Sequence, residues 1–144
     1  MIELTGDEEL ALRRVGNRKA AHRLEEEGKG ALVNYAEHMG LLSDSITICK
    51  NISCCMDVVD FDLAAEAYSG LLGKDIEPME LWKVCSHVSQ VERDFNLREG
   101  MNPNEDTLPS RFRKPIPDGP AKGTTINIDR LVKDYYKEKG WDTE

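Results

Sequence analysis

Five of the six prolines lie between residues 101 and 127, and this clustering divides the chain into helical and non-helical parts. A proline inside a helix removes a backbone hydrogen bond and clashes with the preceding turn. We therefore expect residues 101–127 to form a long irregular segment. Connections of this length are usually functional, disordered or packed onto a larger body. The five prolines are Pro103, Pro109, Pro115, Pro117 and Pro120.

Apolar residues recur every three or four positions on both sides of this segment, which is typical of helices that bury one face. The pattern predicts helices at residues 7–15, 18–27, 31–42, 61–72, 78–99 and 128–139, with the second mostly exposed to solvent. No segment alternates with period two. At 144 residues, we expect a single all-α domain, residues 1–144, built as a helical bundle with the Pro-rich irregular segment before the last helix.

Polar and glycine residues stand where helix ends are expected, because side-chain oxygens cap helix starts and glycine adopts the left-handed backbone at helix ends. Pro78 suits the first turn of its helix, and Trp141 is expected to tuck back under the last helix. The expected starts are Thr5 or Asp7, Asp60, and Thr125 or Asn127, and the expected ends are Gly73, Gly100 and Gly140.

The net charge of −8 argues against nucleic acid as the main partner, because phosphate binding requires clustered Lys and Arg. The charge is uneven, at −7 over residues 59–109 and +2 over residues 110–144. No apolar run approaches the roughly 20 residues of a membrane helix, and the N-terminus lacks the pattern of a signal peptide. We therefore expect a cytoplasmic protein without a membrane partner.

The four cysteines are Cys49, Cys54, Cys55 and Cys85, and a disulfide framework is not expected in the cytoplasm. Cys85 lies on an apolar stripe and is expected in the core. The C-x4-C-C spacing of the other three fits no standard zinc pattern. They are interpreted first as packed, buried thiols and second as a zinc or redox thiol site. No motif of a self-contained enzyme is present.

Several long motifs carry a resemblance to a known family. Residues 91–112 read VERDFNLREGMNPNEDTLPSRF, residues 119–123 read GPAKG, and residues 128–141 read IDRLVKDYYKEKGW. Together with GKGALVNYAEHMGLLSDSITICK at residues 28–50, these resemble the C-terminal helical region of the tungsten-dependent aldehyde ferredoxin oxidoreductase family. The resemblance is continuous from about Gly28 to Trp141.

The resemblance implies a cofactor site around a D-x-x-G-L-C motif. In the family, the motif's Asp hydrogen-bonds the pterin of a tungstopterin, and its Cys is the fourth ligand of a [4Fe–4S] cluster. Here these residues are Asp44 and Cys49, and Ile48 and Lys50 would lie close to the cofactor. The motif's Gly is Thr47. The family's other three cluster cysteines come from an upstream C-x2-C-x3-C run, and no cysteine precedes Cys49 in this sequence.

The resemblance leaves two hypotheses of function. In the first, the chain is the C-terminal domain or a fragment of an oxidoreductase that converts aldehydes to carboxylic acids and passes electrons through the cluster to ferredoxin. It is then inactive alone, binds no cofactor alone, and has the remaining domains or subunit as its partner. In the second, it is a stand-alone helical binding or assembly module that has lost the cofactor. An uncovered apolar patch near Asp44 and Cys49 would favour the first.

Overall fold

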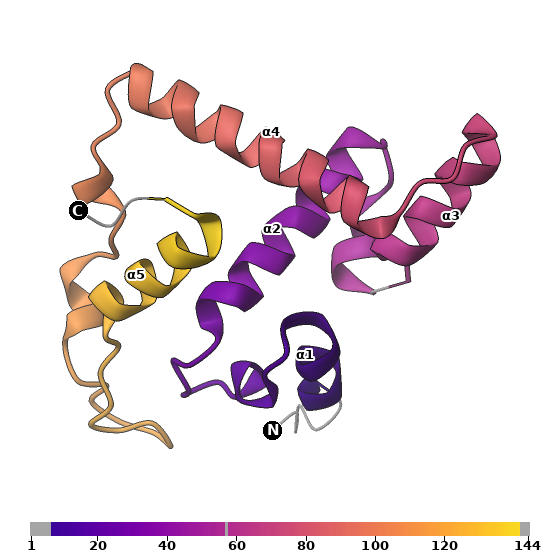
Figure 1. Cartoon of the computed structure of the whole chain (residues 1–144). Helices are drawn as coiled ribbons and strands as arrows, with labels where there is room; N and C mark the ends of the chain where they lie inside the picture. The colour runs from indigo at the N-terminus through magenta and orange to yellow at the C-terminus, as the bar shows by residue number, and fades with distance from the viewer. Residues whose placement is uncertain (1–6, 57, 142–144) are drawn as a thin grey trace. The chain divides into compact units, whose positions relative to one another are not determined.

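A computed structural model describes residues 7–56 and 58–141 of the chain (Figure 1). Over these residues it is all-α and contains no strand, which confirms the predicted fold class. The α-helices are α1 (Asp7–Val15), α2 (Lys29–Ser45), α3 (Phe61–Leu72), α4 (Pro78–Arg98) and α5 (Ile128–Lys139). The shorter elements are the 3-10 turns η1 (Arg18–Ala21), η3 (Pro103–Glu105) and η4 (Ser110–Arg113), and a π-helical turn, η2 (Asn51–Cys55).

Contacts between residues divide the chain into two compact units. Unit 1 comprises Met1–Tyr35 and Asn102–Glu144, and unit 2 comprises Ala36–Met101. Helix α2 begins in unit 1 and ends in unit 2.

Unit 1 contains residues from both the N-terminal and the C-terminal part of the sequence. Gly30 on α2 lies directly against the backbone of α5, so that a Cβ atom at this position would stand 2.7 Å from the carbonyl carbon of Asp134. The Arg113 guanidinium binds the Asp129 carboxylate at 2.8 Å and thereby ties the Pro-rich segment to the first turn of α5. The indole of Trp141 contacts the rings of Tyr135 and Tyr136 edge-on, as the sequence predicts.

Unit 2 is built around the α3–α4 pair and the C-terminal half of α2. The imidazole of His38 is 2% exposed and stacks on the indole of Trp82 at a centroid distance of 4.1 Å. Phe61 meets the same indole at 5.2 Å. The remaining core is formed by apolar side chains: Met39, Leu42, Ala64, Ala65 and Cys85.

Most predicted helix boundaries are confirmed. The Asp60 carboxylate accepts a hydrogen bond from the Leu63 amide at 3.0 Å, and the Asn127 side chain accepts one from the Arg130 amide at 3.1 Å. Gly73 and Gly140 end their helices with positive φ. Thr5 lies outside the described residues. No α-helix occurs within the described residues 101–127.

The helix expected at residues 18–27 is wrong, because only η1 forms there. The Asn17 side chain caps η1 by accepting a hydrogen bond from the Lys19 amide. The Lys29 ammonium then donates to the carbonyl oxygens of Ala20 and His22, at 2.6 and 2.9 Å. Those carbonyls would bond to following amides in an α-helix, so Lys29 provides an alternative partner.

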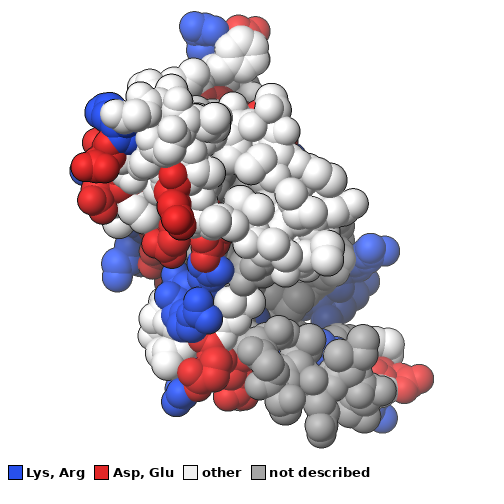
Figure 2. Space-filling view, turned by 90° about the vertical axis from the view of Figure 1, so that its right-hand side faces the viewer, with Lys and Arg blue, Asp and Glu red and all other residues white. Residues whose placement is uncertain are grey.

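Unit 2 exposes much of its apolar surface. Val84, Val91 and Phe95, which belong to the predicted stripe of α4, are each more than half exposed, and so are Leu71 and Leu72 at the end of α3. White atoms, which belong to all residues other than Lys, Arg, Asp and Glu, cover much of the upper part of the view in Figure 2. No helix among the described residues has the length and apolar character needed to cross a membrane.

Candidate functional site

The predicted site residues follow the C-terminal end of α2. Asp44 is in the last turn of the helix, and Ile48, Cys49 and Lys50 form the connection to η2. The Lys50 ammonium lies 2.8 Å from a carboxylate oxygen of Asp44. The structure thus brings Asp44 and Lys50 together across the connection, on its exposed side.

Helix α2 ends in a left-handed turn centred on Thr47. The Ile48 amide donates to the Ser43 carbonyl at 2.9 Å, which is the long-range bond of a Schellman-type helix end. Thr47 has φ of 58° and is the one non-glycine residue with positive φ among those described. A left-handed backbone costs a non-glycine residue roughly 1–2 kcal/mol. The motif's glycine position therefore has the geometry that glycine suits.

A buried hydroxyl pair supports the connection from its inner side. Ser43 donates to the Met39 carbonyl at 2.7 Å, so its single proton is occupied. Its oxygen lies 2.5 Å from the hydroxyl oxygen of Ser53 in η2, which is therefore the donor. Ser43 and Ser53 are 1% and 2% exposed. The sequence analysis did not identify this pair, because two serines ten residues apart form no recognised motif.

The cysteines separate into two kinds. Cys49, Cys54 and Cys55 are exposed, whereas Cys85 is buried in α4 and burial raises the pKa of its thiol. The core position of Cys85 is confirmed, and the interpretation of the other three as packed, buried thiols is wrong. Their connection runs along the surface, where loops usually lie.

The residues around Lys50 shift the pKa of its ammonium group. The hydrogen bond that Lys50 donates to Asp44, the negative charge of Asp44 and a smaller effect of Cys54 raise the pKa of Lys50. Within the part of the chain that the structure describes, no three His, Cys, Asp or Glu side chains are grouped so that they could hold a metal ion. Cys49 can thus offer one thiolate, whereas a [4Fe–4S] cluster requires four ligands; these residues do not fit the whole cluster.

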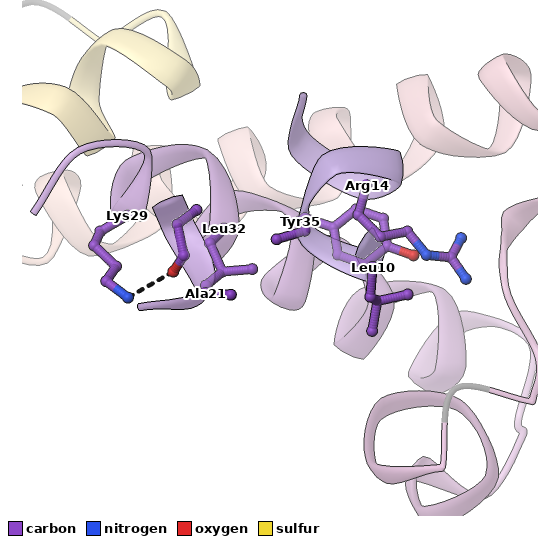
Figure 3. Close-up of a pocket in the computed structure, with 8 residues that line it drawn as sticks. Leu10, Arg14, Ala21, Lys29, Leu32 and Tyr35 are labelled. Carbon is purple, nitrogen blue, oxygen red and sulfur yellow. Dashed lines mark hydrogen bonds between the residues drawn. The ribbon is translucent and has the colours of Figure 1, made fainter. Parts of the chain in front are cut away.

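Unit 1 contains a separate cavity of about 250 Å³ between α1, η1 and α2. Leu10, Leu32 and Tyr35 contribute to its lining, and the Arg14 guanidinium lies over the Tyr35 ring at 5.4 Å (Figure 3). The Lys29 ammonium at its edge is the one that binds the carbonyls of η1. None of the predicted site residues lines this cavity.

The sequence was compared with known proteins. The family described as "Aldehyde ferredoxin oxidoreductase, domains 2 & 3" matches residues 2–144. A tungsten-containing aldehyde ferredoxin oxidoreductase of Pyrococcus furiosus is 35% identical over 107 residues, which are 70% of this chain and 18% of the relative. No solved structure matches significantly.

Two further relatives have the same name and show similar values. The protein of Pyrococcus horikoshii is 38% identical and that of Thermococcus kodakarensis 37%, each over 87 residues, or 56% of this chain and 14% of the relative. The chain thus spans less than a fifth of the length of these relatives. The family match covers nearly every residue, and the chain belongs to the aldehyde ferredoxin oxidoreductase family, within its domains 2 and 3.

Proposed function

We propose that these residues form one wall of the cofactor site in a tungstopterin aldehyde:ferredoxin oxidoreductase. In this assembly an aldehyde and water give a carboxylic acid, and two electrons and two protons are released, with ferredoxin as the electron acceptor. A bound tungstopterin would supply the oxidation chemistry, and a [4Fe–4S] cluster, with Cys49 as one of its ligands, would carry the electrons. The chain is inactive without the remaining domains or subunit. Its cytoplasmic location stays a prediction from the sequence.

Each residue of the connection has a proposed role. Cys49 supplies one thiolate to the cluster, and thiolates are the usual ligands of such clusters. Asp44 accepts hydrogen bonds from the amino-pyrimidine edge of the pterin, and an ionised carboxylate is an acceptor with two oxygens. Ile48 and Lys50 flank Cys49 and lie near the cofactor. The other three cluster ligands come from outside this sequence.

The observation that carries the proposal is the exposure of Cys49 beside the Asp44–Lys50 pair. A thiol that contributes to a cluster shared with other domains must be accessible before assembly, and Cys49 meets this condition. The Lys50 ammonium, next to Cys49 in the sequence, also pairs with the exposed carboxylate of Asp44 at 2.8 Å.

The test is the iron content of the assembled oxidoreductase, purified without oxygen from its native source organism. Cys49→Ser should lower the iron bound per assembly, because serine replaces a thiolate ligand. Cys55→Ser is the matched control, since Cys55 is equally exposed and has no proposed ligand role. Equal iron in the wild type, Cys49→Ser and Cys55→Ser would contradict the proposal.

One observation favours the alternative, a stand-alone helical module without cofactor. Thr47 places a β-branched side chain in the left-handed turn, where the family motif has glycine and the backbone can approach a ligand closely. If the native protein purifies without tungsten, iron or a larger partner, the stand-alone module replaces the first proposal.

A further inference from the structure

The connection that contains Cys49 is fixed to α2 by two neighbouring residues. Ser43 bonds to Ser53 on the buried side, and Asp44 pairs with Lys50 on the exposed side. Cys49 lies in the sequence between the members of both pairs. From this geometry we infer that Ser53 is a positioning residue for Cys49, an inference that rests on the ligand role proposed above.

The Ser53 hydroxyl is directed by a short chain of hydrogen bonds. Because Ser43 already donates to Met39, Ser53 must donate to Ser43 at 2.5 Å. Its other acceptors, the Lys50 carbonyl at 3.5 Å and the Cys54 sulfur at 3.7 Å, are more distant. One buried donor thus connects η2 to the last turns of α2.

The backbone between Ser43 and Ser53 needs a restraint from outside its own amide bonds. Its left-handed residue is Thr47, which favours relaxation toward another conformation. Outside the helical elements, its amide bonds run from Ile46 to the Leu42 carbonyl at 3.0 Å, from Ile48 to Ser43, and from Ile52 to the Cys49 carbonyl at 3.1 Å. A ligand of a metal cluster must be held in a defined place, and the buried serine pair provides that restraint on this connection.

The two pairs differ in strength. Ser43 and Ser53 are almost fully buried, and a buried donor left without its partner loses its hydrogen bond without regaining one from water. The Asp44 and Lys50 side chains are 62% and 56% exposed, and ion pairs of this kind contribute little. Ser53 is therefore the main positioning residue, and Lys50 contributes less.

The test is site-resolved hydrogen exchange on the full chain. Ser53→Ala should speed exchange of the Ile48 and Ile52 amides by about tenfold, the size expected for one hydrogen bond. Exchange in the middle of α4, at Val88, should stay as in the wild type. Lys50→Gln should change the same two amides by about twofold or less.

Two further variants separate positioning from general destabilisation. Ser43→Ala removes the acceptor of the same bond, so the double variant Ser43→Ala/Ser53→Ala should exchange no faster than the faster single variant, as coupled residues do. Ser69→Ala is the matched control in the same unit. Its hydroxyl donates to Ala65 and accepts from the Ile76 amide, so it should affect Ile76 and not Ile48.

The outcomes distinguish this inference from the proposed function. Unchanged exchange at Ile48 in Ser53→Ala, or an equal increase at Val88, overturns the inference whatever the iron content. In the assembled oxidoreductase, Ser53→Ala should also speed the loss of iron to a chelator several-fold, and Ser69→Ala should not. If the exchange behaves as expected but Cys49→Ser retains its iron, the proposed function fails, and the positioning role fails with it.

Discussion

The backbone amide of Asn127 donates to a carboxylate oxygen of Glu26 at 2.7 Å, although 101 positions separate the two residues in the sequence. Asn127 also caps α5 by accepting a hydrogen bond from the Arg130 amide. Glu26 thus lies at the N-terminal end of α5, where the helix dipole favours a negative charge. Together with the Arg130 guanidinium, which lies 3.9 Å from the other carboxylate oxygen of Glu26, this contact joins the N-terminal turns to the last helix within unit 1.

Removal of this contact should lower the free energy of unfolding in graded steps. Glu26→Ala loses two contributions: the hydrogen bond, about 0.5–1.5 kcal/mol, and the negative charge, which acts on the helix start and on Arg130 at 3.9 Å, about 0.3–1 kcal/mol. Glu26→Gln retains an acceptor oxygen and should lose only the second. Glu27→Ala is the control, because Glu27 forms only an exposed ion pair with Lys19 at 3.4 Å. Urea unfolding checks the order, and equal stability of all three variants would contradict it.

The close approach of α2 and α5 should make Gly30 intolerant of a side chain. The added methyl group of Gly30→Ala would meet the Asp134 backbone at 2.7 Å, and such overpacking costs about 1–3 kcal/mol. Gly70→Ala provides the control, since no atom lies within 4 Å of its added Cβ and alanine favours a helix by up to about 1 kcal/mol. The urea midpoint of unfolding should fall in Gly30→Ala and rise in Gly70→Ala. A neutral Gly30→Ala would show that the two helices can move apart.

The left-handed turn at the end of α2 should accept glycine without loss. Thr47→Gly removes a backbone cost of roughly 1–2 kcal/mol and adds the flexibility cost of glycine, about 0.5–1 kcal/mol. The variant should be as stable as the wild type or more stable by up to about 1.5 kcal/mol. Thr125→Gly, which has no positive φ to relieve, should be less stable. The measurement is the thermal unfolding midpoint of the two variants. If both variants unfold at a lower temperature than the wild type, the backbone of Thr47 is not strained.

The Arg113–Asp129 pair should produce a specific pH dependence. A hydrogen bond from Arg113 and its positive charge lower the pKa of Asp129 below the ordinary value of 3.8. A carboxylate whose pKa is depressed in the folded state stabilises the fold above that ordinary value. Its contribution is lost as the pH falls through the lower, folded pKa.

The measurement is a carboxyl NMR titration of Asp129 in the wild type and in Arg113→Gln. The pKa of Asp129 should rise toward 3.8 in the variant, and 1 M salt should shift the wild type in the same direction. Arg98→Gln serves as the control, because Arg98 pairs with Glu99 and not with Asp129. A pKa of Asp129 that stays depressed in Arg113→Gln would assign the shift to the N-terminus of α5 instead.

The helix boundaries were predictable because their causes are local. Asp60, Asn127, Gly73 and Gly140 act on amides and carbonyls within a few positions, and the structure shows each in its expected place. The exception was the stretch at residues 18–27. There Lys29, which lies outside the segment, donates to two of its carbonyls, and helical spacing alone carried no sign of these bonds.

The family also followed from the sequence, since its motifs are read in order along the chain. The cofactor role of Asp44 and Cys49 stays a prediction. The packing of side chains around these motifs did not follow from the sequence. The sequence contains Ser43 and Ser53, but only the turn at Thr47 brings their hydroxyls to 2.5 Å in a buried place. Side-chain burial depends on what packs from elsewhere in the chain, which explains why Cys85 is covered while Cys49, Cys54 and Cys55 are exposed. The sequence by itself determined the five α-helices, most of their ends and the family, because these depend on neighbours along the chain. The tertiary structure alone decided which polar groups meet, because that requires contacts between distant residues.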